Sequence, residues 1–357
     1  MELMVGSLAK IDQVDLVRKA EDLGATHFGV GEGPVLFSDP YQFLALAARE
    51  TSTIKLGTWV TNPLTRLAPT TANSFATLNA LAPGRLFMGI GTANNAMRSM
   101  GRDVATLREL ERSVEVIKGL LAGQRVTHSW RGQDRAIEFL DTAGHWYNID
   151  DPVEVLWAAG GPKSLALAAK HADYVTYCLG PDPDMIGLVR RELDKAVADA
   201  GRPPGSVKLV GVSWFYLLQS GETWQDAVDH GFGSAPISSC LTNFAFMQRH
   251  VDELGEPIVN ASTQAAMAYL GDPNSPEARD YLSIWSKYLK GLDPRHRPLI
   301  TEELVDYWCL YGTPDHLREK TRLMQEAGVD LVGVMLANPF TAGRDLADIG
   351  RTILTPA

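Results

Sequence analysis

The sequence predicts an α/β fold in which eight parallel strands close into a (β/α)8 barrel. Apolar, strand-like segments alternate with helix-like segments along most of the 357 residues. The strand-like segments are almost continuously apolar, which is typical of parallel strands buried on both faces. Eight strand units can be counted, which is the number that a closed barrel requires. An open, doubly wound sheet is the alternative architecture for the same alternation.

The expected strands and helices follow one another in a regular order. The strands are predicted at residues 3–7, 26–33, 54–63, 85–92, 153–161, 174–180, 207–218 and 329–336. Helical spacing of apolar residues predicts helices at 11–24, 39–52, 69–84, 105–123, 162–172, 184–201 and 313–328. Local signals support these bounds, because Asp39 before Pro40 is a typical helix start and Gly24 a typical helix end.

Two segments interrupt the alternation, and residues 1–357 are predicted to form one barrel domain that carries them as insertions. Residues 124–152 contain short strand-like stretches, and residues 220–300 contain helical fragments without a clear strand. The second insertion is a candidate lid over the site, because glycine and serine suit mobility. Its Phe244, Phe246 and Met247 suit an apolar wall.

Composition and charge narrow the class of protein. A net charge of −10 argues against nucleic acid or an anionic membrane as the main partner. No apolar stretch reaches the roughly 18 residues of a spanning helix. The three cysteines are far apart and form no CxxC pair, so neither a zinc site nor a disulfide framework is expected. With no signal-peptide pattern, we expect a cytoplasmic protein that has no metal site and a small-molecule substrate.

The segment 86–101, LFMGIGTANNAMRSMG, contains a G-x-G-x-x-N pattern directly after the fourth strand. A dinucleotide fingerprint would lie in the first strand–helix unit, end in Gly or Ala, and have an acidic residue about 20 positions further on. The pattern therefore does not predict a Rossmann site. Thr92, Asn94 and Asn95 are suited to donate hydrogen bonds to a polar ligand chain, and the two asparagines are equally suited to cap a helix.

Two further strand ends carry candidate site residues. Gly160, Gly161, Pro162 and Lys163 open a helix after the fifth strand, and such a helix start attracts anions. The same residues also suit an ordinary turn with a solvated lysine. Glu32, at the end of the second strand, is the one carboxyl group near glycines at a strand end. A functional role and a structural hydrogen bond are both open for it.

Three stretches together resemble the bacterial luciferase-like superfamily of flavin and F420-dependent oxidoreductases. They are DPYQFLALAARETSTIKLGTWVTNPLTR, LNALAPGRLFMGIGTANNAMRSMG and GGPKSLALAAKHADYV. The branch similar to methylenetetrahydromethanopterin reductase, which uses coenzyme F420, is the nearest in pattern. The insertions lie outside this resemblance.

The resemblance implies a TIM barrel, usually a homodimer, that binds F420 or FMN at the carboxyl ends of its strands. It implies a non-prolyl cis peptide between Trp59 and Val60, where a bulge supports the back of the ring. Thr61, the next residue, is counted with these two as cofactor-binding. It also implies that Thr92, Asn94 and Asn95 contact the ring and its ribityl chain. Residues 160–163 match the family's phosphate loop. Many F420 enzymes carry an acidic residue followed by a histidine at the end of strand 2; here Glu32 stands in the place of the acid, and Gly33 follows where the histidine would be.

Three functions follow as hypotheses. The first is an F420-dependent oxidoreductase that transfers a hydride between the deazaflavin C5 and a small organic substrate, with Glu32 handling the proton. Arg66 and Arg98 are then candidates to contact the anionic cofactor tail. The second is a two-component FMN-dependent monooxygenase that uses O2. In both cases a flavin or F420 reductase is a possible supplier of reduced cofactor. The third is a cofactor-free ligand-binding paralogue, whose third strand would lack the bulge.

Overall fold

Eight parallel strands close into a barrel in the computed structural model, which describes residues 2–354 except 141–143, 145, 271–290 and 337. The barrel strands are β1 (Glu2–Leu8), β2 (His27–Gly31), β3 (Lys55–Thr61), β4 (Leu86–Ile90), β7 (Glu154–Ala158), β8 (Tyr174–Cys178), β9 (Lys208–Leu217) and β11 (Leu331–Leu336). They pair in this order, and β11 pairs with both β9 and β1 to close the ring. The eight predicted strands and the predicted barrel are therefore confirmed.

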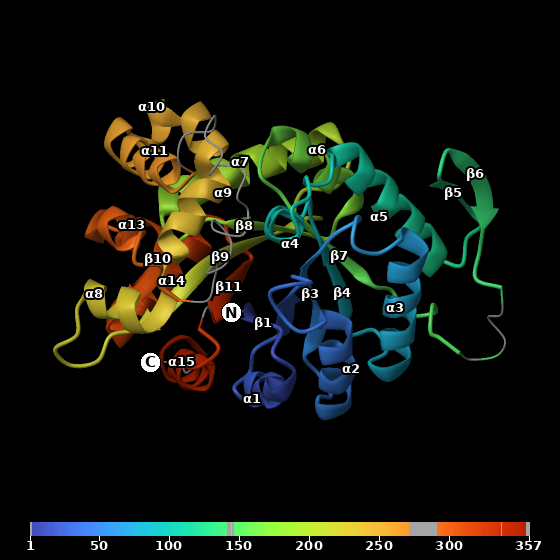
Figure 1. Cartoon of the computed structure of the whole chain (residues 1–357), viewed down its shortest axis with the longest axis horizontal. Helices are drawn as coiled ribbons and strands as arrows, with labels where there is room; N and C mark the ends of the chain where they lie inside the picture. Colours follow the sequence, from blue (N-terminus) through green and yellow to red (C-terminus); the bar gives the residue numbers. More distant parts are fainter. Residues whose placement is uncertain (1, 141–143, 145, 271–290, 337, 355–357) are drawn as a thin grey trace.

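Helices surround the barrel on its outside (Figure 1). The helices outside the two interruptions are α1 (Asp15–Asp22), α2 (Pro40–Glu50), α3 (Ala68–Leu81), α4 (Asn94–Ser99), α5 (Leu107–Leu121), α6 (Pro162–His171), α7 (Pro183–Asp199), α14 (Pro314–Glu326) and α15 (Ala342–Ile349). The predicted start of α2 is confirmed, since the Asp39 carboxylate accepts from the backbone N–H groups of Tyr41 and Gln42.

The first interruption is a hairpin outside the barrel. β5 (Val126–Trp130) and β6 (Gln133–Ile137) pair antiparallel and form a sheet of their own. In Figure 1 this hairpin projects beyond α5, away from the barrel strands.

The second interruption is mostly helical in its described part. It contains α8 (Trp224–Asp226), a π-helical turn (Ala227–Phe232), α9 (Ala235–Arg249), α10 (Val251–Leu254) and α11 (Glu256–Leu270). Beyond it, α13 (Glu302–Trp308) leads into β10 (Cys309–Gly312), a strand that the sequence did not predict. β10 pairs parallel with the last four residues of β9, beginning at Trp214, which is also the last β9 residue that pairs with β11.

Two apolar cores stabilise this architecture. The larger core lies between the barrel and its helices. The smaller one fills the barrel interior with Met4, Trp59, Phe87, Leu156, Tyr174, Val210, Val212 and Leu331. Because the interior is packed with side chains, ligands are confined to the loops at one end of the strands. Among the described residues, no helix combines the length and apolar character needed to cross a membrane.

Candidate active site at the mouth of the barrel

Two adjoining cavities lie where the barrel strands end. The first has a volume of about 400 Å³ and is lined largely by residues at or just after the carboxyl ends of β1, β2, β3, β4, β7 and β11. The second has a volume of about 420 Å³ and lies against the start of α6. Thr92, Ala158 and Gly160 line both cavities, so the two are neighbouring parts of one elongated site. We refer to them as the mouth cavity and the α6 cavity.

The floor of the mouth cavity is formed by Trp59 and Val60 of β3. The peptide bond between them is cis, as the resemblance implied. The pairing of β3 with β4 shifts register between Thr58 and Thr61, so β3 carries a bulge at this point. A cofactor-free paralogue was expected to lack such a bulge.

The indole of Trp59 fits into the barrel because three neighbouring strands carry glycine beneath it. A Cβ atom on Gly6 would lie 2.5 Å from the ring, one on Gly333 would lie 2.8 Å from it, and one on Gly29 would lie 2.7 Å from the Trp59 Cβ. Real Cβ atoms do not approach other atoms so closely, and the glycines are therefore required by the position of the ring.

Glu32 lines the mouth cavity and is held by donors from the loop after β3. Thr65 Oγ1 donates to its Oε1 at 2.7 Å, and Asn62 Nδ2 donates to its Oε2 at 3.3 Å. Thr61 Oγ1 donates to Oε2 as well. Glu32 is thus the acceptor in three hydrogen bonds, which fix the direction of its carboxylate.

Thr61 links Glu32 to a buried tyrosine by hydrogen bonds. Its side chain is fully buried, and its hydroxyl lies 3.0 Å from the Tyr41 hydroxyl. A threonine hydroxyl has one hydrogen, which Thr61 gives to Glu32, so Tyr41 is the donor to Thr61. Burial raises the pKa of the Tyr41 hydroxyl well above its ordinary value, so Tyr41 keeps its proton. A chain of hydrogen bonds therefore runs from Tyr41 through Thr61 to Glu32.

The loop after β4 brings Thr92 and Asn94 to the mouth cavity. Asn94 is the first residue of α4, but the residue before it, Ala93, is the N-cap, and no side chain caps this helix. The Asn94 Oδ1 atom instead accepts a hydrogen bond from Arg98 Nε at 2.6 Å. The side chain of Asn95 lies outside the described residues.

The loop after β7 lines the α6 cavity with Gly160, Gly161, Pro162 and Lys163. Gly161 is the N-cap of α6, and no side chain bonds to the first turn of this helix. The N-terminal N–H groups are therefore left for a ligand or water. Lys163 is exposed, and no carboxylate in the described part of the chain lies within ion-pair distance of it.

Several contributors to the site were not foreseen from the sequence. Leu241 and Thr242 of α9 line the mouth cavity, together with Leu8, Phe37 and Met335. The expected apolar wall is wrong for Phe246 and Met247, which are buried in the core under α9. Arg66 pairs with Asp39 at 2.6 Å and stacks on Tyr41, so its charge is already engaged.

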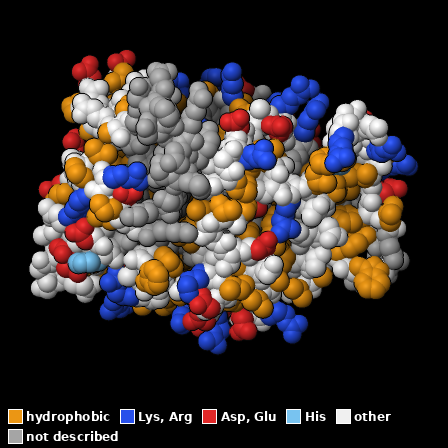
Figure 2. Space-filling model, viewed as in Figure 1, with side chains coloured by type: hydrophobic (Ala, Val, Ile, Leu, Met, Phe, Trp, Pro, Cys, Tyr) orange, Lys and Arg blue, Asp and Glu red, His pale blue; other side chains and the backbone are white. Residues whose placement is uncertain are grey.

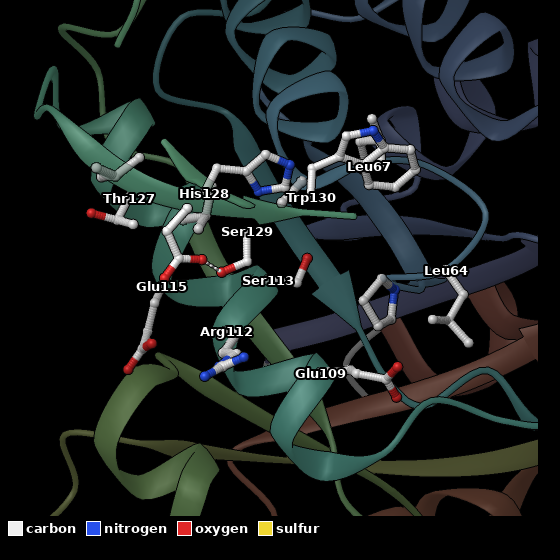
Figure 3. A pocket seen from close by; sticks show the side chains of 15 residues that line it. Leu64, Leu67, Glu109, Arg112, Ser113, Glu115, Thr127, His128, Ser129 and Trp130 are labelled. Atoms are coloured by element: carbon white, nitrogen blue, oxygen red, sulfur yellow. Dashed lines mark hydrogen bonds between the residues drawn. The ribbon is translucent and has the colours of Figure 1, made fainter. Parts of the chain in front are cut away.

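A cavity larger than either of these lies elsewhere, between the β5–β6 hairpin and α5, with a volume of about 680 Å³. Figure 3 shows His128 and Trp130 of the hairpin on one side of it, and Ser113 and Leu64 on another. On the outer surface of α5 and α6, Glu111 and His171 are 3.3 Å apart, with Glu115 nearby. Neither feature includes a residue of the barrel mouth predicted from the sequence.

Comparisons with known proteins identify the family of this chain. The family model described as luciferase-like monooxygenase matches residues 6–331. The 5,10-methylenetetrahydromethanopterin reductase of Methanolobus tindarius is 33% identical over 323 residues, which cover 88% of this chain and 87% of that protein. An F420-dependent glucose-6-phosphate dehydrogenase of Nakamurella multipartita is 29% identical, over 71% of this chain and 76% of its own.

A solved structure shows the same fold. The coenzyme F420 dependent tetrahydromethanopterin reductase from Methanopyrus kandleri superposes with a TM-score of 0.71 at 20% identity, covering 99% of both chains.

Proposed function

This chain belongs to the luciferase-like monooxygenase family, and from that premise we propose that it is an F420-dependent oxidoreductase. It transfers a hydride between C5 of the deazaflavin and a small organic substrate. The names of its relatives support this choice, because they are reductases and dehydrogenases and the dehydrogenase named above is F420-dependent. The observation that carries the proposal is the two-part site at the barrel mouth.

The residues present fit a cofactor that has a flat ring, a polar chain and an anionic end. The mouth cavity has a flat, largely apolar floor at Trp59 and Val60. Gly91 also lines this cavity, and it packs closely on the neighbouring strand, since a Cβ there would lie 3.0 Å from Ala158. Gly160 has open space on its Cα, and the uncapped start of α6 follows it. A ring in one cavity and a phosphate in the other would match this arrangement.

The residues predicted to bind the ring, its chain and the phosphate each have a task in this proposal. Trp59 and Val60, supported by Thr61, hold the back of the ring. Thr92, Asn94 and Asn95 bind the ring edge and the ribityl chain. Gly160, Gly161, Pro162 and Lys163 bind the phosphate through backbone N–H groups and one positive charge. When bound, the deazaflavin supplies a hydride donor and acceptor at C5.

Glu32 handles the proton that accompanies the hydride. Its carboxylate lines the mouth cavity, and Thr61, Asn62 and Thr65 hold it in one orientation. An oriented carboxyl group beside the reacting atoms can accept a proton as the carboxylate or donate one as the carboxylic acid, without further rearrangement. Leu8, Phe37 and Met335 are the apolar side chains that exclude water around it.

Binding titrations test the cofactor. F420 is fluorescent, so its affinity for the purified chain is measured directly, with FMN as the competing candidate. We expect F420 to bind at micromolar concentration and FMN to bind more weakly. Tight binding of FMN with O2 uptake on addition of reduced FMN would favour the monooxygenase instead. Absence of binding for both would support the cofactor-free paralogue.

A turnover assay tests the reaction. Oxidation of reduced F420 is followed in the presence of candidate electrophiles, beginning with 5,10-methylenetetrahydromethanopterin because a 33% identical relative is named for it. A cellular F420 reductase would be the supplier of reduced cofactor.

We also propose that the chain is a homodimer. The cavity beside the β5–β6 hairpin is open, and Leu64, Leu67 and Trp130 around it are 38%, 41% and 51% exposed. Figure 2 shows hydrophobic side chains gathered on the side of the molecule that carries the hairpin, α3 and α5. Exposed apolar patches of this kind are typical of protein interfaces.

A further inference from the structure

Helix α9 lies against both parts of the site. Leu241 and Thr242 line the mouth cavity. Arg249, the last residue of α9, has its Nη1 atom 3.8 Å from the position that a Cβ on Gly161 would take. Thr242 and Arg249 are seven residues apart, which is two helical turns, so they share one face of the helix. One face of α9 therefore borders the mouth cavity at Thr242 and the phosphate loop at Arg249.

Arg249 brings a positive charge that no carboxylate neutralises. In the described parts of the chain, neither Arg249 nor Lys163 lies within ion-pair distance of an acidic group. Glu192, on the facing helix α7, is instead engaged by His250 at 2.9 Å. Two unneutralised cations thus flank Gly160 and Gly161 beside the uncapped start of α6, an arrangement that favours an anion.

The guanidinium is already positioned by its own helix. Nη1 donates to the carbonyl of Ala245 at 3.1 Å, and the group packs on the Phe246 ring at 5.4 Å from its centre. Such contacts reduce the rotamer freedom that binding would otherwise remove. The remaining N–H groups of the guanidinium are available for an acceptor.

Helix α9 is anchored to the barrel strands. Asn243 Nδ2 donates to the Cys178 carbonyl of β8 at 2.6 Å, and Trp214 Nε1 of β9 donates to Ser239 Oγ at 3.0 Å. These bonds tie the helix to two barrel strands. In this arrangement α9 forms one side of the site, and the lid expected for residues 220–300 stays a prediction.

We propose that Arg249 is a phosphate-binding residue, which closes the anion site of the cofactor opposite Lys163 and the first turn of α6. This inference rests on the proposed function and adds to it a contact from the second insertion, which lies outside the three sequence stretches quoted for the resemblance. Arg249 contacts the phosphate and not the ring. Its contribution is therefore present for F420 and absent for the same deazaflavin ring with its ribityl chain but without the phosphate and glutamate tail.

Fluorescence titrations with these two probes test the inference. They compare the wild-type chain with Arg249→Ala, Arg249→Lys and Arg49→Ala. Arg49 is an exposed arginine near the end of α2, and its removal makes the same change in net charge far from the phosphate loop. We expect Arg249→Ala to weaken F420 binding by about tenfold to a hundredfold, as for the loss of a charge-assisted hydrogen bond. Arg249→Lys should restore part of the loss.

The phosphate-free probe separates a phosphate contact from a structural role. All four proteins should bind it with equal affinity, and Arg49→Ala should also bind F420 as the wild type does. The inference would be overturned if Arg249→Ala bound F420 with the same affinity as Arg49→Ala. It would also be overturned if Arg249→Ala lost the same factor of affinity for F420 and for the phosphate-free probe. Failure of the wild-type chain to bind F420 at all is a distinct result, which would overturn the proposed function and this inference with it.

Discussion

Trp59 Nε1 donates a hydrogen bond to Thr176 Oγ1 at 3.0 Å, and this bond joins β3 to β8 across the barrel interior. The two strands are separated by β4 and β7 in the sheet. The bond fixes the orientation of the indole that forms the floor of the mouth cavity. Because Gly6, Gly29 and Gly333 leave space for Trp59, the position of the floor depends on packing as well as on the hydrogen bond.

The packing beneath Trp59 predicts that Gly6→Ala is destabilising. The new Cβ would lie 2.5 Å from two ring carbons and 2.9 Å from Met335 Cε, so the floor must shift. We expect a loss of about 1–3 kcal/mol in the free energy of unfolding, measured by urea denaturation. Gly343→Ala is the matched control, because the nearest atom to its Cβ is 4.0 Å away and alanine suits a helix. It should leave stability unchanged or raised; a similar loss in both variants would contradict this account.

Glu32→Gln should separate binding from turnover. The amide has nearly the same shape but cannot take up a proton at neutral pH, so a fall in turnover of about 10²- to 10⁴-fold is expected. F420 affinity should change little. Thr65→Val, which removes the donor at 2.7 Å and keeps the carboxylate, should reduce turnover much less. Turnover is measured as oxidation of reduced F420 with an accepted substrate. If Glu32→Gln turned over as fast as the wild type, Glu32 would not be the residue that transfers the proton.

His27 makes stability depend on pH. Burial, with Lys55 and Lys208 nearby, lowers the pKa of His27 from 6.5 to about 4. Between pH 6.5 and about pH 4, His27 is largely protonated in the unfolded chain and largely neutral in the folded chain. The free energy of unfolding therefore falls as the pH is lowered through this window. Lowering the pH from 7.5 to 5 should therefore reduce the free energy of unfolding by about 2 kcal/mol through His27.

Urea unfolding at these two pH values measures the effect. His27→Gln should lose about 2 kcal/mol less than the wild type when the pH is lowered. Thr26 Oγ1 lies 2.8 Å from His27 Nδ1, so Thr26→Val removes this contact and keeps the imidazole. That control should be less stable at both pH values and should keep the pH dependence. Equal pH dependence in the wild type and His27→Gln would show that His27 is not responsible.

The hairpin predicts how the proposed dimer is held. Light scattering should give twice the chain mass of 39.0 kDa for the wild type. Trp130→Ala removes the largest exposed apolar group beside the hairpin cavity and should shift the protein toward the monomer. Phe340→Ala, which removes an 89% exposed aromatic ring before α15, should not. A wild-type monomer would refute the dimer, and a dimer that tolerates Trp130→Ala would place the interface elsewhere.

The barrel itself was accessible from local patterns. Eight apolar strands, helical spacing and signals such as Asp39–Pro40 are written in short stretches, and each was found where it was expected. β10 was missed because it has four residues and pairs only with the end of β9. A strand so short carries too few residues to show a period.

For the candidate site too, part was predicted from the sequence and part was seen only in the structure. The glycines and polar residues at strand ends were identified from the sequence, because parallel strands bring their carboxyl ends to one side of the barrel. Thr61 was predicted to bind the cofactor, which stays a prediction, and the sequence did not show that its hydroxyl donates to Glu32. Arg66 was a candidate for the cofactor tail, and its partner Asp39 is 27 positions away in the chain.

The sequence by itself determined the barrel, the loops that form its mouth and the family to which the chain is similar, since these depend on residue types within short windows. Only the tertiary structure decided what α9 contributes. Which face of that helix meets the mouth depends on anchors such as Asn243 to Cys178, which lie 65 residues apart in the chain. No local period encodes such a contact. Arg249 therefore reads as a surface arginine in the sequence, and as a neighbour of Gly161 in the fold.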